Sequence, residues 1–427
     1  MSVCATLLCI TAMADKMEKN MVNVKDFGAI GDGLYLDTRA IQNAINTGKI
    51  VYFPAGVYRT GTIYLKSGGG LHLSPHAVIL GSKYPEDYNK DDFDRRNPVS
   101  RKEQVSGAHL IIARDCTDIT VSGSGTICGN RNGIFDTDIV HTPNGNRPRY
   151  VLPRWRPGAM LYFIGCKNVK LEGIKLNDPT YWTAFFHDCD NVEITGIMVK
   201  ADIFTNNSDG LDIDCCRNVK VTNCTIFSGD DAIAIRGADS RLNKDSECSN
   251  VIVDNCILNS SACGVRIGVG SGTIRNCKLT NLQIVNSAIG IGICPSYSLG
   301  TCTRIDNVAF ENISINAVQT LKMAPSWGAD INDPAIKKVS NITFRNIDAV
   351  ASKPSVLVFP FKKEMFENIS IKDSNFTLLS TGDSLNDKHW KSPEYGIINI
   401  LGTTENILTD CKGTSADGKV LVMQKSR

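Results

Sequence analysis

The sequence predicts an all-β protein, a right-handed parallel β-helix with a capping helix at its N-terminal end. A short segment recurs along the chain, which is the signature of a solenoid. The four clearest copies begin 23, 27 and 32 residues apart, a spacing that suits coils with loops of variable length. They read CKNVKLEG from residue 166, CDNVEITG from 189, CRNVKVTN from 216 and CSNVIVDN from 248. Weaker copies begin at residues 116, 305, 339, 366 and 404.

Each copy has the pattern of a strand with one buried face. In the first copy Val169 and Leu171 are apolar, whereas Lys170 and Glu172 are charged, and this alternation has the period of two that a strand requires. An asparagine precedes the strand, and because asparagine tolerates left-handed backbone angles it suits a sharp corner. Stacked coils would let the amides hydrogen-bond along the stack. The recurring asparagines are Asn168, Asn191, Asn218, Asn250, Asn307, Asn341, Asn368 and Asn406.

The cysteines fit the same architecture. Cys166, Cys189, Cys216 and Cys248 open the four best copies, so we expect them to form a ladder of buried free thiols inside the solenoid. The 16 cysteines are scattered over a large chain, and no pair of CxxC motifs has the spacing of a zinc site. A β-propeller or a sandwich is the alternative fold, but both use tight hairpins, and hairpin signals are sparse here.

Residues 21–427 are interpreted as a single β-helix domain. Asp37 or Thr38 can cap a short helix through AIQNAI that closes at Gly48, and this helix would cover the open end of the solenoid. Between residues 85 and 160 the repeat weakens, and we expect long loops that leave the helix body. These loops carry Arg95, Arg96, Arg147, Arg149, Trp155 and Arg156.

Residues 1–20 are either a signal peptide or a disordered lead-in. The apolar run VCATLLCITAMA ends in small residues that resemble a cleavage site, but no Lys or Arg precedes it. The signal-peptide interpretation predicts a secreted or periplasmic protein.

Composition excludes two classes of partner. The formal net charge of +2 lacks the basic excess of a nucleic-acid-binding protein. No stretch reaches the roughly 18 apolar residues of a membrane-spanning helix. The sequence does not give the oligomeric state.

Three aspartates are the candidate catalytic residues. Asn207-Ser208-Asp209-Gly210 opens one coil, and Ser228-Gly229-Asp230-Asp231 opens the next. Neighbouring strands of a sheet lie roughly 4.8 Å apart, so Asp209, Asp230 and Asp231 should crowd one patch, where like charges raise one another's pKa. Aspartate beside glycine is also ordinary turn chemistry. Two such motifs in register favour a glycosidase, in which one carboxylic acid protonates the leaving oxygen and a carboxylate activates water.

These motifs resemble glycoside hydrolase family 28, the polygalacturonases and rhamnogalacturonases. The resemblance rests on NSDG followed one coil later by GDDAIAI, and it extends from VKDFGAIGDG at residue 24 through FPAGVYRTG at 53 to NVAFENISI at 307. It implies that Asp230 is the general acid and that Asp209 and Asp231 hold and activate the water. The product would then have an inverted anomeric carbon.

The sequence departs from the polygalacturonase pattern at two places. Ala262-Cys263-Gly264 stands where these enzymes have Gly-His-Gly, and Gly290-Ile291-Gly292 stands where they carry an Arg-Ile-Lys segment that grips the substrate carboxylate. Without that charge-assisted clamp, unbranched polygalacturonate is in doubt as the substrate. Candidates for other sugar contacts are the cations Arg266 and Arg236, and Trp182 and His187 on the preceding coil, each of which also suits a structural role. Tyr181 lies beside them.

The predicted function is therefore inverting hydrolysis of a pectin-like polysaccharide or oligosaccharide, of the galacturonan or rhamnogalacturonan type, without a cofactor or a metal. Two alternatives stay open. A polysaccharide lyase on the same fold would reuse the aspartates as calcium ligands, and a non-catalytic glycan-binding protein would keep the fold with a decayed site.

Overall fold

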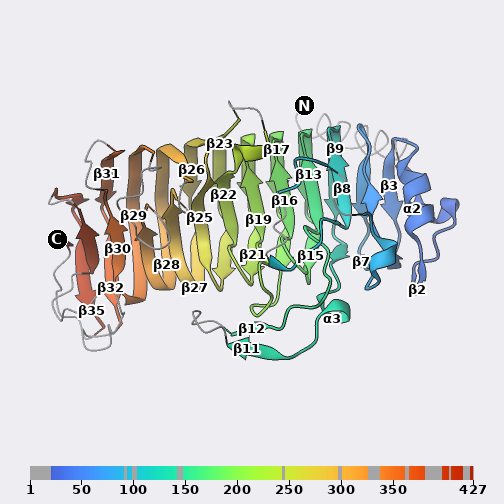
Figure 1. The fold of residues 1–427 in the computed structure, drawn as a ribbon, viewed down its shortest axis with the longest axis horizontal. Helices are drawn as coiled ribbons and strands as arrows, with labels where there is room; N and C mark the ends of the chain where they lie inside the picture. Colours follow the sequence, from blue (N-terminus) through green and yellow to red (C-terminus); the bar gives the residue numbers. More distant parts are fainter. Residues whose placement is uncertain are drawn as a thin grey trace, which may run out of the picture.

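The structure is a parallel β-helix, as predicted, and the coils are right-handed. In this computed structural model the strands stack along one long axis from the N-terminal to the C-terminal end (Figure 1). The structure describes residues 21–426 except for residues 91–93, 99–102, 142–147, 243–245, 297–300, 326–336, 361–364, 380–396, 403–404 and 417–423. The interpretation of residues 1–20 as a signal peptide, and the predicted loop position of Arg147, lie outside the described residues.

Each coil after the first contributes one strand to each of three stacks, within which neighbouring strands pair in parallel. The first stack contains β5 (Ile63–Tyr64), β8 (Ile111–Arg114), β13 (Leu161–Ile164), β16 (Ala184–His187), β19 (Leu211–Asp214), β22 (Ile233–Gly237), β25 (Cys263–Gly270), the end of β27 (Gln283–Cys294), the end of β28 (Arg304–Met323), β30 (Ser355–Val358), β33 (Ile398–Leu401) and β36 (Gln424–Ser426).

The second stack follows it around the coil. It contains β1 (Met21–Asn23), β3 (Ile50–Phe53), β6 (Gly70–Leu73), β9 (Thr117–Gly123), β14 (Lys167–Glu172), β17 (Asp190–Thr195), β20 (Arg217–Thr222), β23 (Glu247–Asp254), β26 (Thr273–Thr280), the start of β28, the start of β29 (Val339–Lys353), β31 (Phe366–Lys372) and β34 (Leu408–Thr409).

The third stack closes the coil. It contains β2 (Asp32–Leu36), β4 (Gly56–Thr60), β7 (Ala77–Gly81), β10 (Thr126–Cys128), β15 (Lys175–Asn177), β18 (Met198–Lys200), β21 (Thr225–Ser228), β24 (Ile257–Ser260), the start of β27, the middle of β28, the end of β29, β32 (Asn375–Leu378) and β35 (Lys412–Ser415). Inward-facing side chains of all three stacks form one continuous apolar core.

The asparagine corner forms as predicted, with two interruptions. Asn191 donates to Asn168 at 2.7 Å and Asn250 donates to Asn218 at 3.0 Å, and these residues have a positive φ. Asn218 itself donates to Asp190, and Asn341 donates to Asp306, so aspartates replace the amide acceptor there. Asn406 was predicted to belong to this row, but it instead accepts from the backbone of Leu408.

One feature went beyond the predicted pattern, and one prediction about the interior of the coils is confirmed. A second asparagine ladder, not predicted, links Asn223 to Asn255 and Asn312 to Asn346 at the next corner. The cysteine prediction is confirmed, because Cys166, Cys189, Cys216 and Cys248 are all buried and free.

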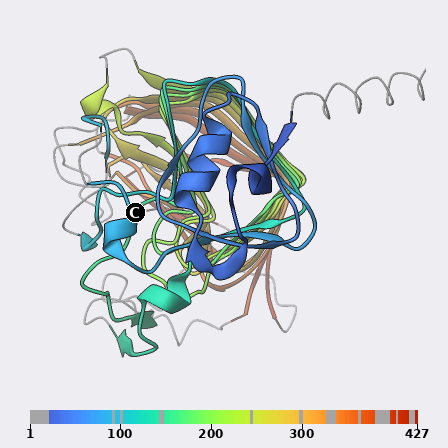
Figure 2. The same ribbon diagram turned by 90° about the vertical axis from the view of Figure 1, so that its right-hand side faces the viewer.

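The N-terminal cap forms, but by a different contact. Helix α2 (Thr38–Ile45) covers the end of the solenoid (Figure 2). Asp37 stands at the N-cap position, yet its carboxylate accepts from the backbone of Ile30 at 2.8 Å and Gly31 at 3.0 Å in the preceding turn. Gly48, with φ of 72°, lies just beyond the helix as expected.

Residues 85–160 are only partly loop. They contain the three strands of a full coil, β8, β9 and β10, and outside the coils the antiparallel pair β11 (Ile139–His141) and β12 (Pro148–Tyr150). The other short elements are η1 (Val24–Phe27), η2 (Pro85–Asp87), α3 (Arg131–Ile134) and η4 (Asp239–Arg241). Among the described residues, no helix is both long and apolar enough to cross a membrane.

Candidate active site

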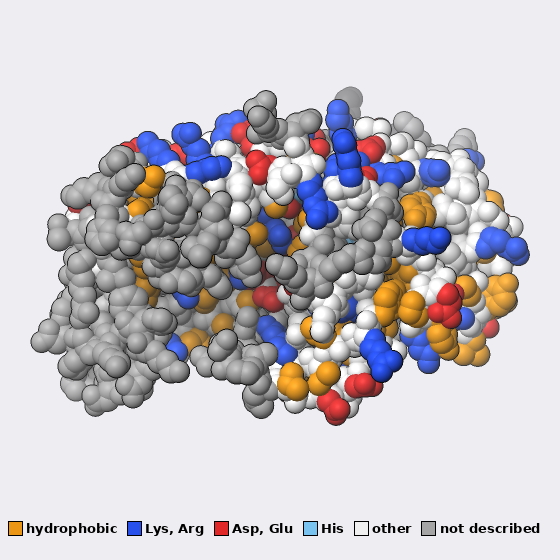
Figure 3. Space-filling view, in the orientation of Figure 1, with side chains coloured by type: hydrophobic (Ala, Val, Ile, Leu, Met, Phe, Trp, Pro, Cys, Tyr) orange, Lys and Arg blue, Asp and Glu red, His pale blue; other side chains and the backbone are white. Residues whose placement is uncertain are grey.

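The three aspartates lie at the turns that lead into two neighbouring strands of the first stack. Leu211 pairs with Ile233, and the backbone N–H of Gly210 donates to the carbonyl of Asp231 at 2.8 Å, so the two motifs stack in register. Figure 3 shows acidic and basic side chains together near the middle of the face of the molecule that it draws. One cavity brings the three carboxylates together. It is lined by Glu103, Trp182, Asn207, Asp209, Asp230, Asp231, Ala234, Arg236, Arg266 and Val269.

The glycines of both motifs are required by how closely these turns stack. A Cβ on Gly210 would lie 2.4 Å from the carbonyl oxygen of Ala232, and one on Gly229 would lie 2.4 Å from Oγ of Ser208. Such distances are well inside van der Waals contact. The Ser208 hydroxyl uses that space, because it accepts from the N–H of Gly229 at 3.1 Å. The small residues therefore allow the two acid-bearing turns to stack in direct contact.

Burial sets the electrostatics of the acids. Asp209 is only 5% exposed and Asp231 only 4%, whereas Asp230 is more accessible. Burial, together with the nearby carboxylates of Asp212, Asp230 and Asp231, holds the pKa of Asp209 well above its usual range. Burial also raises the pKa of Asp231, although Arg266 opposes the shift.

Arg266 forms a two-pronged ion pair with Asp231. Its Nε lies 2.5 Å from Oδ2 of Asp231, and its Nη2 donates to Oδ1 at 3.0 Å. Oδ1 also accepts from the backbone N–H of Cys263 at 3.1 Å. The strand that carries Arg266 then bulges, and Val269 has a φ of 72°, which is strained for a β-branched residue. That bulge brings Val269 into the lining of the cavity.

Arg236 is held by acids that lie behind the cavity. Its Nη1 donates to Oδ1 of Asp212 at 3.0 Å, its Nε lies 4.0 Å from Asp214, and its guanidinium lies 4.7 Å from the centre of the Trp182 ring. Burial raises the pKa of Asp212 to about 7, although Arg236 acts to lower it. Burial also acts to raise the pKa of Asp214, but contacts with His187 and Arg236 leave it below its usual value.

Comparison with known proteins identifies the family. A model described as glycosyl hydrolases family 28 matches residues 92–391, which include all three aspartates. The chain belongs to glycosyl hydrolase family 28. It is therefore a glycoside hydrolase, and the resemblance seen in its motifs is confirmed. A second model, described as rhamnogalacturonase A/epimerase, pectate lyase-like, matches residues 21–71.

Individual relatives are distant. The chain is 26% identical to a probable polygalacturonase of Vitis vinifera, over 81% of this chain and 73% of that protein. It is 24% identical to an exo-poly-alpha-D-galacturonosidase of Dickeya chrysanthemi, over 92% of this chain and 74% of that protein. Among solved structures, an exopolygalacturonase of Thermotoga maritima superposes with a TM-score of 0.66 at 20% identity, over 95% of this chain and 91% of that chain. This last likeness shows the shared fold.

The substrate-binding candidates have different surroundings in this family 28 site. Arg236, Arg266 and Trp182 line the cavity, but both arginines are already paired with aspartates. His187 is fully buried, with Nδ1 3.3 Å from Oδ2 of Asp214, and it is not among the lining residues. Gly292 pairs with Arg266 on the next rung, where the clamp residues were expected.

Sequence reasoning missed Glu103, Asp212 and Asp214. The signal for the last two was present in LDID, because Leu211 and Ile213 face the core and the alternate aspartates must then face outward. Glu103 had no such signal, since it lies on a loop whose course the repeat does not define.

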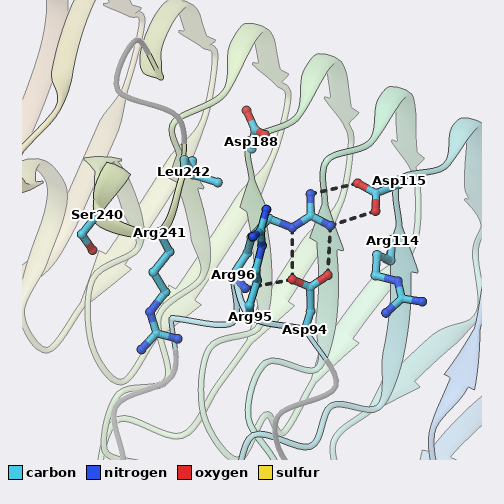
Figure 4. A pocket seen from close by; sticks show the side chains of 9 residues that line it. All are labelled: Asp94, Arg95, Arg96, Arg114, Asp115, Asp188, Ser240, Arg241 and Leu242. Atoms are coloured by element: carbon cyan, nitrogen blue, oxygen red, sulfur yellow. Dashed lines mark hydrogen bonds and ion pairs between the residues drawn. The ribbon is translucent and has the colours of Figure 1, made fainter.

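A larger cavity of about 900 Å³ lies at the other ends of the first-stack strands. It is lined by Asp94, Arg95, Arg96, Arg114, Asp115, Asp188, Ser240, Arg241 and Leu242. Figure 4 shows the guanidinium of Arg96 between the carboxylates of Asp94 and Asp115, to which it donates at 2.8–3.1 Å. We call it the arginine cavity, and the cavity of the three aspartates the acidic cavity.

Proposed function

We propose that the acidic cavity hydrolyses a glycosidic bond in a pectic, galacturonate-containing polysaccharide, with inversion at the anomeric carbon. The observation that carries this proposal is the convergence of Asp209, Asp230 and Asp231, from two rungs, on one cavity. The printed names of the relatives, polygalacturonase and exo-poly-alpha-D-galacturonosidase, support the substrate class.

The proposed roles follow from accessibility and pairing. Asp230, the most accessible of the three, donates its proton to the leaving glycosidic oxygen as the bond to the anomeric carbon breaks. Asp209 and Asp231 hold a water on the opposite face of the sugar and take its proton as its oxygen attacks that carbon. A base works best when its pKa lies near the working pH, so the upward shifts at Asp209 and Asp231 suit this role.

The surrounding groups position these acids. Arg266 fixes the orientation of Asp231 through both of its oxygens. Arg236 is paired with Asp212 and Asp214, and its guanidinium lies over the ring of Trp182. We assign His187 a positioning role on Asp214, because its buried ring faces that carboxylate.

The test is product analysis on pectic oligosaccharides. Hydrolysis yields one new reducing end for each bond cut and no product that absorbs in the ultraviolet. A lyase would leave a carbon–carbon double bond and raise that absorbance, and a glycan-binding protein would bind the oligosaccharides without releasing reducing ends.

A further inference from the structure

A fourth carboxylate faces the acidic cavity from outside the β-helix body. Glu103 lies on the loop between η2 and β8, and it lines the cavity together with the three aspartates. Its carboxylate accepts a hydrogen bond from the hydroxyl of Tyr181, whose ring packs 4.6 Å from that of Trp182. The side chain of Glu103 is therefore directed into the site.

A buried arginine fixes the loop that carries Glu103. Arg156 is fully buried, and it donates to the carbonyl of Glu103 at 2.8 Å and to the carbonyl of Thr180 at 2.9 Å. It also donates to the side chain of Asn207 at 3.1 Å, two residues before Asp209. Ser106, on the same loop, donates to the Arg156 carbonyl at 3.0 Å. The position of Glu103 is thus tied to that of the catalytic turn.

Among the described residues that line the cavity, every cation is paired with an aspartate. The two arginines among its lining residues, Arg236 and Arg266, are occupied by Asp212 and Asp231. A uronate carboxylate would have to displace one of these partners while it faces Glu103 and the aspartates, and close like charges are unfavourable in a partly desolvated site. Sugar hydroxyls, in contrast, are donors that carboxylates accept well.

We propose that Glu103 is a specificity-determining residue, and that the acidic cavity accepts an uncharged sugar unit and disfavours a uronate. This inference rests on the proposed function. It places the uncharged unit of a mixed pectic chain, a hexose or deoxyhexose, in the cavity, with uronates on the adjoining units outside it.

The experiment compares two oligosaccharides of equal length, one made only of galacturonate and one in which galacturonate alternates with an uncharged sugar. Both kcat/KM and the Kd are measured for the wild type and for Glu103→Gln, which keeps the shape and an acceptor for Tyr181 but removes the charge. Glu193→Gln, at an exposed position on β17, is the matched control.

We expect the wild type to prefer the alternating oligosaccharide. In Glu103→Gln the preference should shift toward oligogalacturonate by on the order of tenfold, through KM with little change in kcat, and the shift should shrink in high salt. An unchanged ratio, equal to that of Glu193→Gln, would overturn the inference. So would an equal loss of kcat on both substrates, because Glu103 would then act in the chemistry. If no variant cleaves either oligosaccharide, the proposed function fails, and the binding preference still tests Glu103.

Discussion

The acidic cavity and the arginine cavity lie at opposite ends of the same strands. They differ in how far their buried carboxylates are paired with cations. The acidic cavity lies before β19 and β22, whereas the arginine cavity is bordered by Asp115 and Asp188, which follow β8 and β16, and by η4 after β22. The loop that carries Asp94 and Glu103 borders both.

In the arginine cavity each of the three described aspartates has an arginine partner. Arg96 is bonded to two carboxylates at once, and it lowers the pKa of Asp94 against the effect of burial. In the acidic cavity Asp209 is buried beside three other aspartates, and its pKa is displaced upward. Stability alone does not favour that arrangement, and perturbed groups of this kind concentrate at functional sites. The contrast explains why we assign catalysis to the smaller cavity.

The largest expected effect is on turnover. Asp230→Asn keeps the shape of the side chain but removes the proton that the leaving oxygen needs, so kcat should fall by about 10²–10⁴ while substrate binding survives. Asp115→Asn in the arginine cavity should leave kcat within about twofold, since Asp115 does not line the acidic cavity. Initial rates with saturating oligosaccharide measure both. Near-normal turnover of Asp230→Asn would place the acid elsewhere.

The next effect is on stability. Arg266→Gln leaves the buried carboxylate of Asp231 without its partner, which should cost about 3–5 kcal/mol of unfolding free energy near neutral pH. The cost should shrink as the pH falls, because protonation then neutralises Asp231. Arg96→Gln should cost less than Arg266→Gln, because Asp115, one of the two partners of Arg96, is largely exposed, although the other partner, Asp94, is buried. Urea unfolding at two pH values measures both, and equal costs would remove the distinction between the cavities.

The smallest effect has the opposite sign. The folded-state pKa of Asp209 lies above its unfolded value of 3.8, so the folded chain is favoured at low pH and loses stability as the pH rises toward the folded pKa. Asp209→Asn should therefore stabilise the protein by about 0.5–2 kcal/mol at neutral pH while it abolishes activity. The gain should grow from acidic to neutral pH in thermal melts. A destabilised variant at pH 7 would show that Asp209 is better compensated than its neighbours suggest.

The repeat made the fold and the acid-bearing turns predictable. Val169 and Leu171 alternate with charged residues, which indicates a strand, and the structure has a strand there. The asparagines before the strands indicate a left-handed corner, and apart from Asn406 they have a positive φ in the structure. The spacing of Asp209 and Asp230 then fixed their juxtaposition, because one coil separates them.

The remaining features depended on contacts that no local pattern encodes. The pairing of Arg266 with Asp231 spans 35 residues, and a backbone bulge accompanies it at Val269. Glu103 is placed at the site by contacts from other segments, among them the hydrogen bond that Arg156, on another loop, donates to its carbonyl. His187 was predicted to contact the sugar from its place in the sequence, but its ring is fully buried and its Nδ1 lies 3.3 Å from Oδ2 of Asp214.

The most direct test of the central claim is the anomeric configuration of the first-formed product. Proton NMR of wild-type digestion, recorded before mutarotation mixes the anomers, distinguishes inversion from retention. The proposed roles, with Asp230 as acid and a water activated by Asp209 and Asp231, predict that the configuration is inverted. A retained configuration would mean that one of these carboxylates attacks the sugar directly, and it would contradict the assignment.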